Sequence, residues 1–165
     1  MKRCLVGSEM CIRDSGGGTD MTPTFENEED TNFFHSSLKG ACDKHNDNYY
    51  EDFKKNCDEY FYLPHRNEPR GVGGIFFDHL NTGDWDKDFN FVKEVGGQTL
   101  EIINQVVKNK KDLDWTDKEK DKQLVKRGRY VEFNLIWDRG TLFGLKTGGS
   151  TEAILMSMPP EAKWE

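Results

Sequence analysis

The sequence contains no apolar run near the roughly 18 residues of a membrane-spanning helix. It also lacks an excess of positive charge, since the net charge is −7, and this disfavours bulk nucleic-acid binding. Charged residues make up 32% and hydrophobic residues 35% of the chain, a balance typical of a soluble globular domain. An anionic ligand would therefore need a local basic cluster, for which the candidates are Arg66, Arg70, Lys126, Arg127, Arg129 and Arg139. Solvated surface charge is the alternative for Lys126 and Arg127.

Paired cysteines are also missing. The four cysteines are Cys4, Cys11, Cys42 and Cys57, and they form no CxxC motif and match no zinc-site spacing. Cys42 and Cys57 fall on helical patterns, so we expect buried thiols and a reducing compartment. The glycines around Val72 lack the GxxxxGK[ST] pattern of a phosphate loop. Fingerprints of flavin, nicotinamide and iron–sulfur sites are absent from the sequence as well.

Apolar periodicity predicts the helices. They are expected at about 27–45, 49–62, 84–109 and 116–126, and a buried strand at 71–78. Asn27 and Thr116 have the side chains of helix N-caps. Gly96 and Gly97 could kink or break the long third helix.

Strands are predicted for the C-terminal third. Apolar residues alternate over Tyr130–Trp137, and shorter apolar runs follow at 142–145 and 153–158. Asp138-Arg139-Gly140 would form a corner between the first two strands. The whole pattern predicts an α+β fold with an antiparallel sheet flanked by helices.

The first fifteen residues, MKRCLVGSEMCIRDS, fit neither a secretory signal nor a transit peptide. We interpret residues 1–15 as a non-native leader and residues 16–165 as the domain.

Four stretches of the domain resemble the oxygen-dependent coproporphyrinogen-III oxidase family. They are GGGTDMTP from Gly16, CDEYFYLPHRNEPRGVGGIFFDHLN from Cys57, RGRYVEFNLIWDRGTLFGLKTGGSTEAILMSMPP from Arg127, and the closing MSMPPEAKWE. The resemblance covers residues 16–165 and implies the C-terminal part of the family's domain.

The resemblance implies an enzyme of haem biosynthesis that converts coproporphyrinogen III to protoporphyrinogen IX by oxidative decarboxylation. It implies O2 as co-substrate and no obligatory cofactor, with a possible divalent metal in bacterial-type members. It further implies a homodimer through residues 130–165 and a cytoplasmic location, or an organellar one if a native N-terminus carries a transit peptide.

The same resemblance assigns the site residues. Asp20, Asp138 and Arg139 would be catalytic; Arg70, Gly148, Gly149 and Ser150 would bind substrate; His35 and His65 are candidate metal ligands. The residues alone leave other interpretations open. Asp138 could be a turn residue that bonds backbone amides, Arg70 an exposed arginine before a glycine turn, and His35 a satisfied core histidine. The Gly148–Ser150 segment could be a hairpin turn.

The family's proton-donor histidine and an Asn-x-Arg substrate segment are expected outside this chain, so we expect the chain alone to be weakly active or inactive. Two other functions remain open. One is a non-catalytic tetrapyrrole-binding or homodimer scaffold module, and the other is a small anion-binding α+β protein unrelated to tetrapyrroles.

Overall fold

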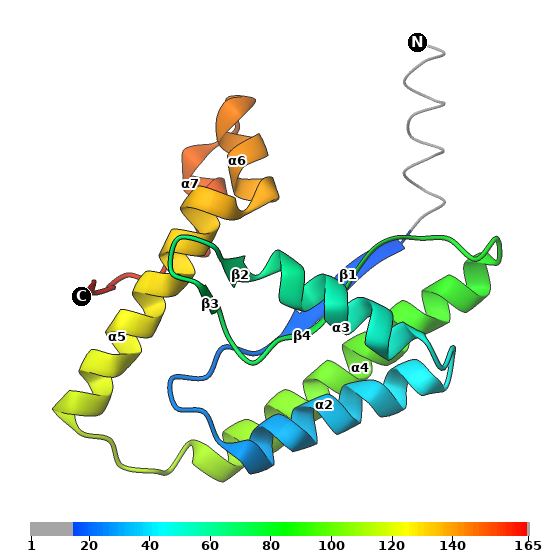
Figure 1. Cartoon of the computed structure of the whole chain (residues 1–165), viewed down its shortest axis with the longest axis horizontal. Coiled ribbons are helices and arrows are strands. Elements are labelled where there is room, and N and C mark those ends of the chain that lie inside the picture. The colour runs from blue at the N-terminus through cyan, green and yellow to red at the C-terminus, as the bar shows by residue number, and fades with distance from the viewer. Residues whose placement is uncertain (1–14, 165) are drawn as a thin grey trace. The chain divides into compact units, whose positions relative to one another are not determined.

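The computed structural model describes residues 15–164 and divides them into two compact units (Figure 1). The first unit holds residues 15–60 and 71–112, and the second holds 61–70 and 113–164. The leader expected at 1–15 lies outside the described residues except for Ser15, as do Cys4 and Cys11. Within the described part of the chain, no helix has the length and apolarity needed to cross a membrane.

The first unit is built on a two-stranded ladder. Strand β1 (Ser15–Asp20) pairs antiparallel with β4 (Gly74–Leu80), and Asp20 lies opposite Gly74. The glycine run from Gly16, expected to be a strand end or turn, is thus part of a strand. Helix α3 (Tyr49–Tyr60) packs on β4, and α2 (Glu28–Asp43) packs along α4 (Trp85–Lys110).

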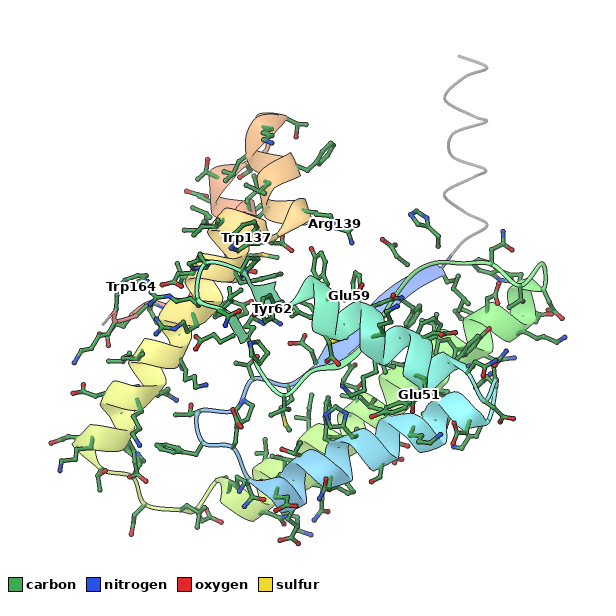
Figure 2. All side chains as sticks on the ribbon, in the orientation of Figure 1. Glu51, Glu59, Tyr62, Trp137, Arg139 and Trp164 are labelled. Atoms are coloured by element: carbon green, nitrogen blue, oxygen red, sulfur yellow. The ribbon has the colours of Figure 1, made fainter. Side chains whose placement is uncertain are left out.

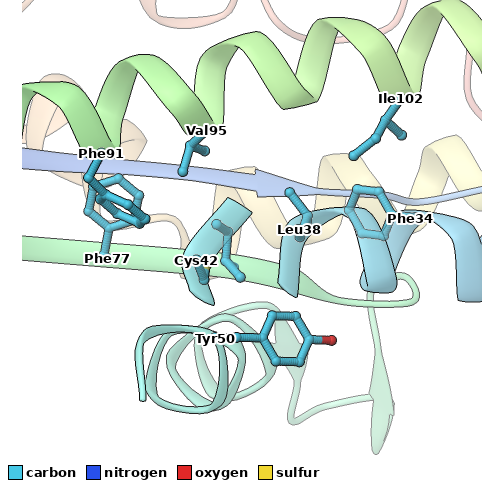
Figure 3. Close-up of a cluster of buried hydrophobic side chains, with 9 residues drawn as sticks. Phe34, Leu38, Cys42, Tyr50, Phe77, Phe91, Val95 and Ile102 are labelled. Atoms are coloured by element: carbon cyan, nitrogen blue, oxygen red, sulfur yellow. The ribbon is translucent and has the colours of Figure 1, made fainter. Parts of the chain in front are cut away.

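The core of this unit lies where α2, α4 and β4 meet (Figure 3). Phe91, Val95 and Ile102 of α4 are buried against α2 and β4. Burial of one such side chain contributes roughly 1.5–3 kcal/mol, so this contact is the main source of the unit's stability. Burial also raises the pKa of the Cys42 thiol to about 11. Cys42 and Cys57 are both buried, which confirms the expected buried thiols.

Two helices begin at the N-cap residues that the sequence predicted. The Asn27 side chain accepts a hydrogen bond from the Asp30 N–H at 2.9 Å. Thr116 and Glu119 form a reciprocal capping box at the start of α5. Both predicted caps are therefore confirmed. Gly96 and Gly97 do not interrupt α4, which is continuous over its 26 residues.

The second unit is mostly helical. The short strands β2 (Tyr62–Leu63) and β3 (Glu68–Pro69) form an antiparallel hairpin. Four helical segments follow: α5 (Asp117–Glu132), the π-helical turn η1 (Phe133–Trp137), α6 (Arg139–Lys146) and α7 (Thr151–Ile154).

The strands predicted at 130–137 and 142–145 are wrong, because α5 extends to Glu132 and is followed by η1 and α6. The apolar run at 153–158 begins in α7, which ends at Ile154, and continues as bends and turns. The buried positions of α5 are Leu124, Gly128 and Glu132, spaced four apart as on one helix face. Leu135 and Trp137 are 41% and 39% exposed. The apparent alternation therefore came from apolar residues on different sides of a helical turn. The α+β class itself, with a small antiparallel sheet among helices, is confirmed.

Gly97 offers a test of the α4 assignment. A Cβ atom at this position would meet nothing within 4 Å, so Gly97→Ala should remove only the helix-propensity penalty of glycine. We expect the free energy of unfolding to rise by roughly 0.5–1 kcal/mol. Urea denaturation followed by circular dichroism measures this. Gly71→Ala is the matched control, because its Cβ would overlap the Met21 carbonyl oxygen and should destabilise. A lower midpoint for Gly97→Ala would contradict an uninterrupted helix.

Candidate functional site

Arg70 is a buried arginine in the second unit. It follows strand β3 and is only 6% exposed, so the interpretation as an exposed arginine is wrong. Its guanidinium carbon lies 4.0 Å from the centre of the Phe61 ring, 4.9 Å from that of Phe133 and 5.3 Å from that of Tyr130. Aromatic faces attract a guanidinium and fix its plane. A cation held in this way, away from bulk water, is well suited to bind a carboxylate with two hydrogen bonds.

Glu132 anchors the hairpin that carries Arg70. Its side chain is buried at the end of α5, and it accepts two hydrogen bonds from Arg66, one of them from Nε at 2.9 Å. His65 Nε2 lies 2.8 Å from the same carboxylate. The hydrogen bonds from Arg66, then the one from His65 and the nearby guanidinium charges, lower the pKa of Glu132 to about 2, against the opposing effect of burial.

A second pair joins the same two segments. Arg129 of α5 donates from Nε to Glu68 of β3 at 2.8 Å. Because Glu68 lies on β3, two residues before Arg70, this ion pair and the Glu132 contacts hold the second strand and the turn of the hairpin against α5. We define Glu132, Arg66, His65, Arg129 and Glu68 as the hairpin clamp.

The clamp extends to the η1 turn through a tryptophan. Trp137 donates from its indole nitrogen to His65 Nδ1 at 3.0 Å, and the two rings stack with centroids 6.0 Å apart. Because an indole nitrogen only donates, Nδ1 must accept, and the ring proton lies on Nε2, facing Glu132. His65 is thus held in one tautomer between Trp137 and Glu132.

Asp138 follows η1 directly, and Arg139 begins α6 (Figure 2). The expected corner between two strands is wrong, because both neighbours are helical. Asp138 is the N-cap of α6, and its side chain accepts from the Thr141 N–H at 2.6 Å. The alternative interpretation, in which the Asp138 side chain bonds a backbone amide, is therefore confirmed. Arg139 is the first residue of α6 and is exposed.

The remaining predicted residues are distributed over both units. Arg70, Asp138 and Arg139 all belong to the second unit, whereas Asp20, partly buried at the end of β1, belongs to the first. The Gly148–Ser150 segment joins α6 to α7, so the hairpin-turn interpretation is wrong. Its Gly149 N–H bonds the Gly144 carbonyl at 3.0 Å, and Ser150 caps α7.

The two candidate metal ligands do not fit a metal ion as they stand. His35 Nε2 lies 2.9 Å from the Val72 carbonyl oxygen and must donate to it, while Nδ1 accepts from the Tyr50 hydroxyl at 3.0 Å. His65 likewise has both nitrogens engaged. Over residues 15–164, no group of three or more His, Cys, Asp or Glu side chains could hold a metal. The satisfied-histidine interpretation fits His35. The metal requirement itself stays a prediction.

Sequence reasoning missed Glu132, Asn134 and Trp137. Asn134 is 7% exposed, and its Nδ2 is one of the buried side-chain nitrogens in the described chain without a hydrogen-bond partner. Glu132 could have been identified from the sequence, because it is a lone acidic residue inside an apolar run. Several basic residues precede this run. Assigning this run to a strand hid that signal, because it placed Glu132 and Asn134 on a polar outer face.

Comparison with known proteins identifies relatives. The family described as Coproporphyrinogen III oxidase matches residues 10–165. Over 149 residues, 90% of this chain, the sequence is 58% identical to the oxygen-dependent coproporphyrinogen-III oxidase of Rickettsia bellii (strain OSU 85-389). It is 56% identical to the protein of that name from Rickettsia akari (strain Hartford) and 55% identical to that from Rickettsia rickettsii (strain Sheila Smith). The chain spans about half the length of these relatives, 53% in each case.

Glu132→Gln should change how stability depends on pH. The pKa of Glu132 is lower in the folded protein, about 2, than the roughly 4.3 of an unfolded glutamate. Its stabilising contribution is therefore complete above about pH 4.5 and is lost as the pH falls toward 2. We expect Glu132→Gln to lower the free energy of unfolding by about 2–3 kcal/mol at neutral pH and to flatten the profile below pH 4.5.

Urea midpoints measured over a pH series test this expectation. Glu59→Gln is the control, since Glu59 forms only an exposed pair with Lys55 at 3.9 Å and should leave the profile unchanged. Parallel profiles for the wild type and Glu132→Gln would show that the carboxylate does not hold the clamp.

Proposed function

The chain belongs to the coproporphyrinogen III oxidase family, and we propose that it forms the propionate-binding part of an oxygen-dependent coproporphyrinogen-III oxidase. The relatives that carry this name match 90% of the chain but extend over about twice its length, since 53% of each is covered. The whole enzyme would oxidatively decarboxylate coproporphyrinogen III to protoporphyrinogen IX.

The observation that carries the proposal is the buried, ring-bounded guanidinium of Arg70. Coproporphyrinogen is a flexible macrocycle with four carboxylates and four pyrrole N–H groups. A net charge of −7 would repel such a tetra-anion in general, so binding needs cations held in fixed places. Arg70 is held by three rings and by a hairpin with one ion pair at its turn and one on its second strand. It would grip one propionate, and Arg139 would orient another.

Acidic residues would bind the pyrrole N–H groups, which are the hydrogen-bond donors of the substrate. Asp138 and Asp20 would accept hydrogen bonds from pyrrole N–H groups and so steady the ring or take a proton from it. The capping bond from Thr141 to Asp138 leaves further acceptor capacity, because a carboxylate has about four lone-pair sites.

The chemistry balances without a resident redox group. Each reacting propionate loses CO2 and two hydrogens and becomes a vinyl group, and one O2 accepts the two hydrogens as H2O2. The electron-rich porphyrinogen supplies the electrons, so the protein's task is positioning and electrostatic stabilisation. In this proposal the reaction needs no obligatory cofactor, and none of its steps involves a metal.

The proposal also includes a partner and a cellular location. We propose a homodimer through residues 130–165. Large apolar side chains are exposed in this segment, namely Leu135, Ile136, Trp137, Phe143, Leu145 and Met156, and such side chains favour an interface. A cytoplasmic location fits the reduced, buried cysteines.

The alternative function, a non-catalytic tetrapyrrole-binding module, is favoured by one observation: the chain spans only about half of its relatives. We expect this chain alone to bind the macrocycle but to show weak or no turnover, because its relatives extend over about twice its length. Assays of catalysis therefore need a full-length relative.

Asp138→Asn, made at the equivalent position of a full-length relative, tests the catalytic role. Asparagine caps helices as well as aspartate does, so α6 and the thermal midpoint should be preserved while the negative charge is lost. We expect kcat for vinyl formation to fall by about 100-fold or more. Thr141→Val, which alters α6 beside the same cap without removing the charge, serves as control. A kcat close to wild type in Asp138→Asn would remove Asp138 from the mechanism.

A further inference from the structure

Asp20 lies at the end of a strand in the first unit. It is the last residue of β1, its partner Gly74 is the first residue of β4, and the two form the last pair of the ladder. The end of a β-ladder opens more readily than its centre. A carboxylate that must keep a fixed position at such an end therefore needs support from neighbouring segments.

The nearest support is the glycine-rich segment 71–74, which runs beside the residue that follows Asp20. The Val72 N–H donates to the Met21 carbonyl at 2.9 Å, and the Met21 N–H donates to the Gly73 carbonyl at 3.0 Å. These two hydrogen bonds carry the pairing of the two chain segments beyond the ladder. Segment 71–74 thus holds Met21 from both its N–H and its carbonyl group.

Glycines allow the two backbones to lie this close. A Cβ atom on Gly71 would lie 2.3 Å from the Met21 carbonyl oxygen, and one on Gly74 would lie 2.8 Å from the Asp20 Cα. A side chain at either position would push the backbones apart. The position of segment 71–74 therefore determines where the backbone of Asp20 lies.

A chain of hydrogen bonds joins this segment to two helices. His35 of α2 donates from Nε2 to the Val72 carbonyl at 2.9 Å, and its Nδ1 accepts from the Tyr50 hydroxyl of α3 at 3.0 Å. One tautomer of His35 serves both bonds, because a carbonyl only accepts. Tyr50 is buried in the core, where Figure 3 shows its ring. We call Tyr50, His35, Val72 and Met21 the strand-end tie.

The strand-end tie connects a rigid part of the unit to a loosely held one. Tyr50 belongs to the buried core cluster, whereas Val72 and Met21 are only partly buried against it. Val72 receives a hydrogen bond at its carbonyl and gives one from its N–H, so a displacement of His35 is passed on to Met21 and Asp20. A misplacement of about 1 Å can reduce a reaction rate by roughly 100-fold.

From these contacts we propose that Tyr50 and His35 are positioning residues, which hold Asp20 in place through Val72 and Met21. The catalytic consequence rests on the proposed function, in which Asp20 accepts hydrogen bonds from pyrrole N–H groups. All members of the tie belong to the first unit, as Asp20 does. The tie gives His35 a task within the protein itself, because both of its ring nitrogens are used in it.

Amide hydrogen exchange of this chain, followed by NMR, tests the strand-end tie without substrate. His35→Leu removes the bond to Val72, so the Val72 and Met21 amides should exchange about tenfold faster, with the amides in the middle of α4 unchanged. His35→Gln keeps an amide that can donate to Val72 but has no imidazole nitrogen, and exchange should stay within about threefold of the wild type. His45→Leu is the matched control, since the His45 ring packs on Phe91, and it should leave both amides unchanged.

Three results of this experiment would overturn the proposal. Equal exchange in the wild type and His35→Leu would show that the tie does not hold the segment. Exchange in His35→Gln as fast as in His35→Leu would show that the site requires an imidazole, as a metal ion would. Exchange in the wild type that accelerates in EDTA would assign His35 to a metal.

Turnover by a full-length relative, with the changes at the equivalent positions, tests the link to Asp20. Tyr50→Phe keeps the buried ring and removes the hydroxyl, and it should lower kcat about tenfold. In an Asp20→Asn background the same change should lower kcat less than about twofold, because the group that Tyr50 positions has already been lost. Equal effects in both backgrounds would overturn the positioning role. An unchanged kcat in Asp20→Asn would instead reject the proposed function of Asp20, a failure that the exchange measurement distinguishes from failure of the tie.

Discussion

The second unit depends on one buried carboxylate. Glu132 lies at the last position of α5 and receives hydrogen bonds from Arg66 and His65 of the β2–β3 hairpin. A buried carboxylate without partners would be costly, so the hairpin cannot leave α5 without exposing or neutralising this charge. The hairpin in turn carries Arg70 among three aromatic rings. A charge at the end of one helix thus determines where a distant guanidinium lies.

This arrangement would suit the proposed binding of a tetra-anion by a chain that is itself negatively charged. Mobile surface arginines would lose side-chain entropy and be screened by salt when they bind a carboxylate. The ring contacts and the hairpin clamp fix the guanidinium before the ligand arrives, so less entropy is lost on binding. Asp138 combines two roles in the same way, because the residue proposed to meet pyrrole N–H groups also begins α6.

Local signals predicted helix starts well in both units. Asn27 and Thr116 mark helix starts because their side chains satisfy backbone N–H groups within the same turn, and this depends on neighbouring residues alone. The region from Tyr130 failed because its apolar residues alternate by chance on a helical and π-helical turn. In this region the helical structure depends on the capping box at Thr116, which begins α5, and on the burial of Glu132. The burial of Arg70 depends on rings from two segments far apart in the sequence, the hairpin and the α5–η1 stretch, which no spacing reveals.

The central claim is that Arg70, fixed by rings and clamp, binds a propionate. The direct measurement is the dissociation constant of this chain for coproporphyrin III, the fluorescent oxidised form of the tetracarboxylate, in the wild type and in Arg70→Gln. The account predicts at least about tenfold weaker binding for Arg70→Gln, corresponding to the roughly 1.5–3 kcal/mol of one charged hydrogen-bonded pair, with helical circular dichroism preserved. Equal affinities in two equally folded proteins would contradict it.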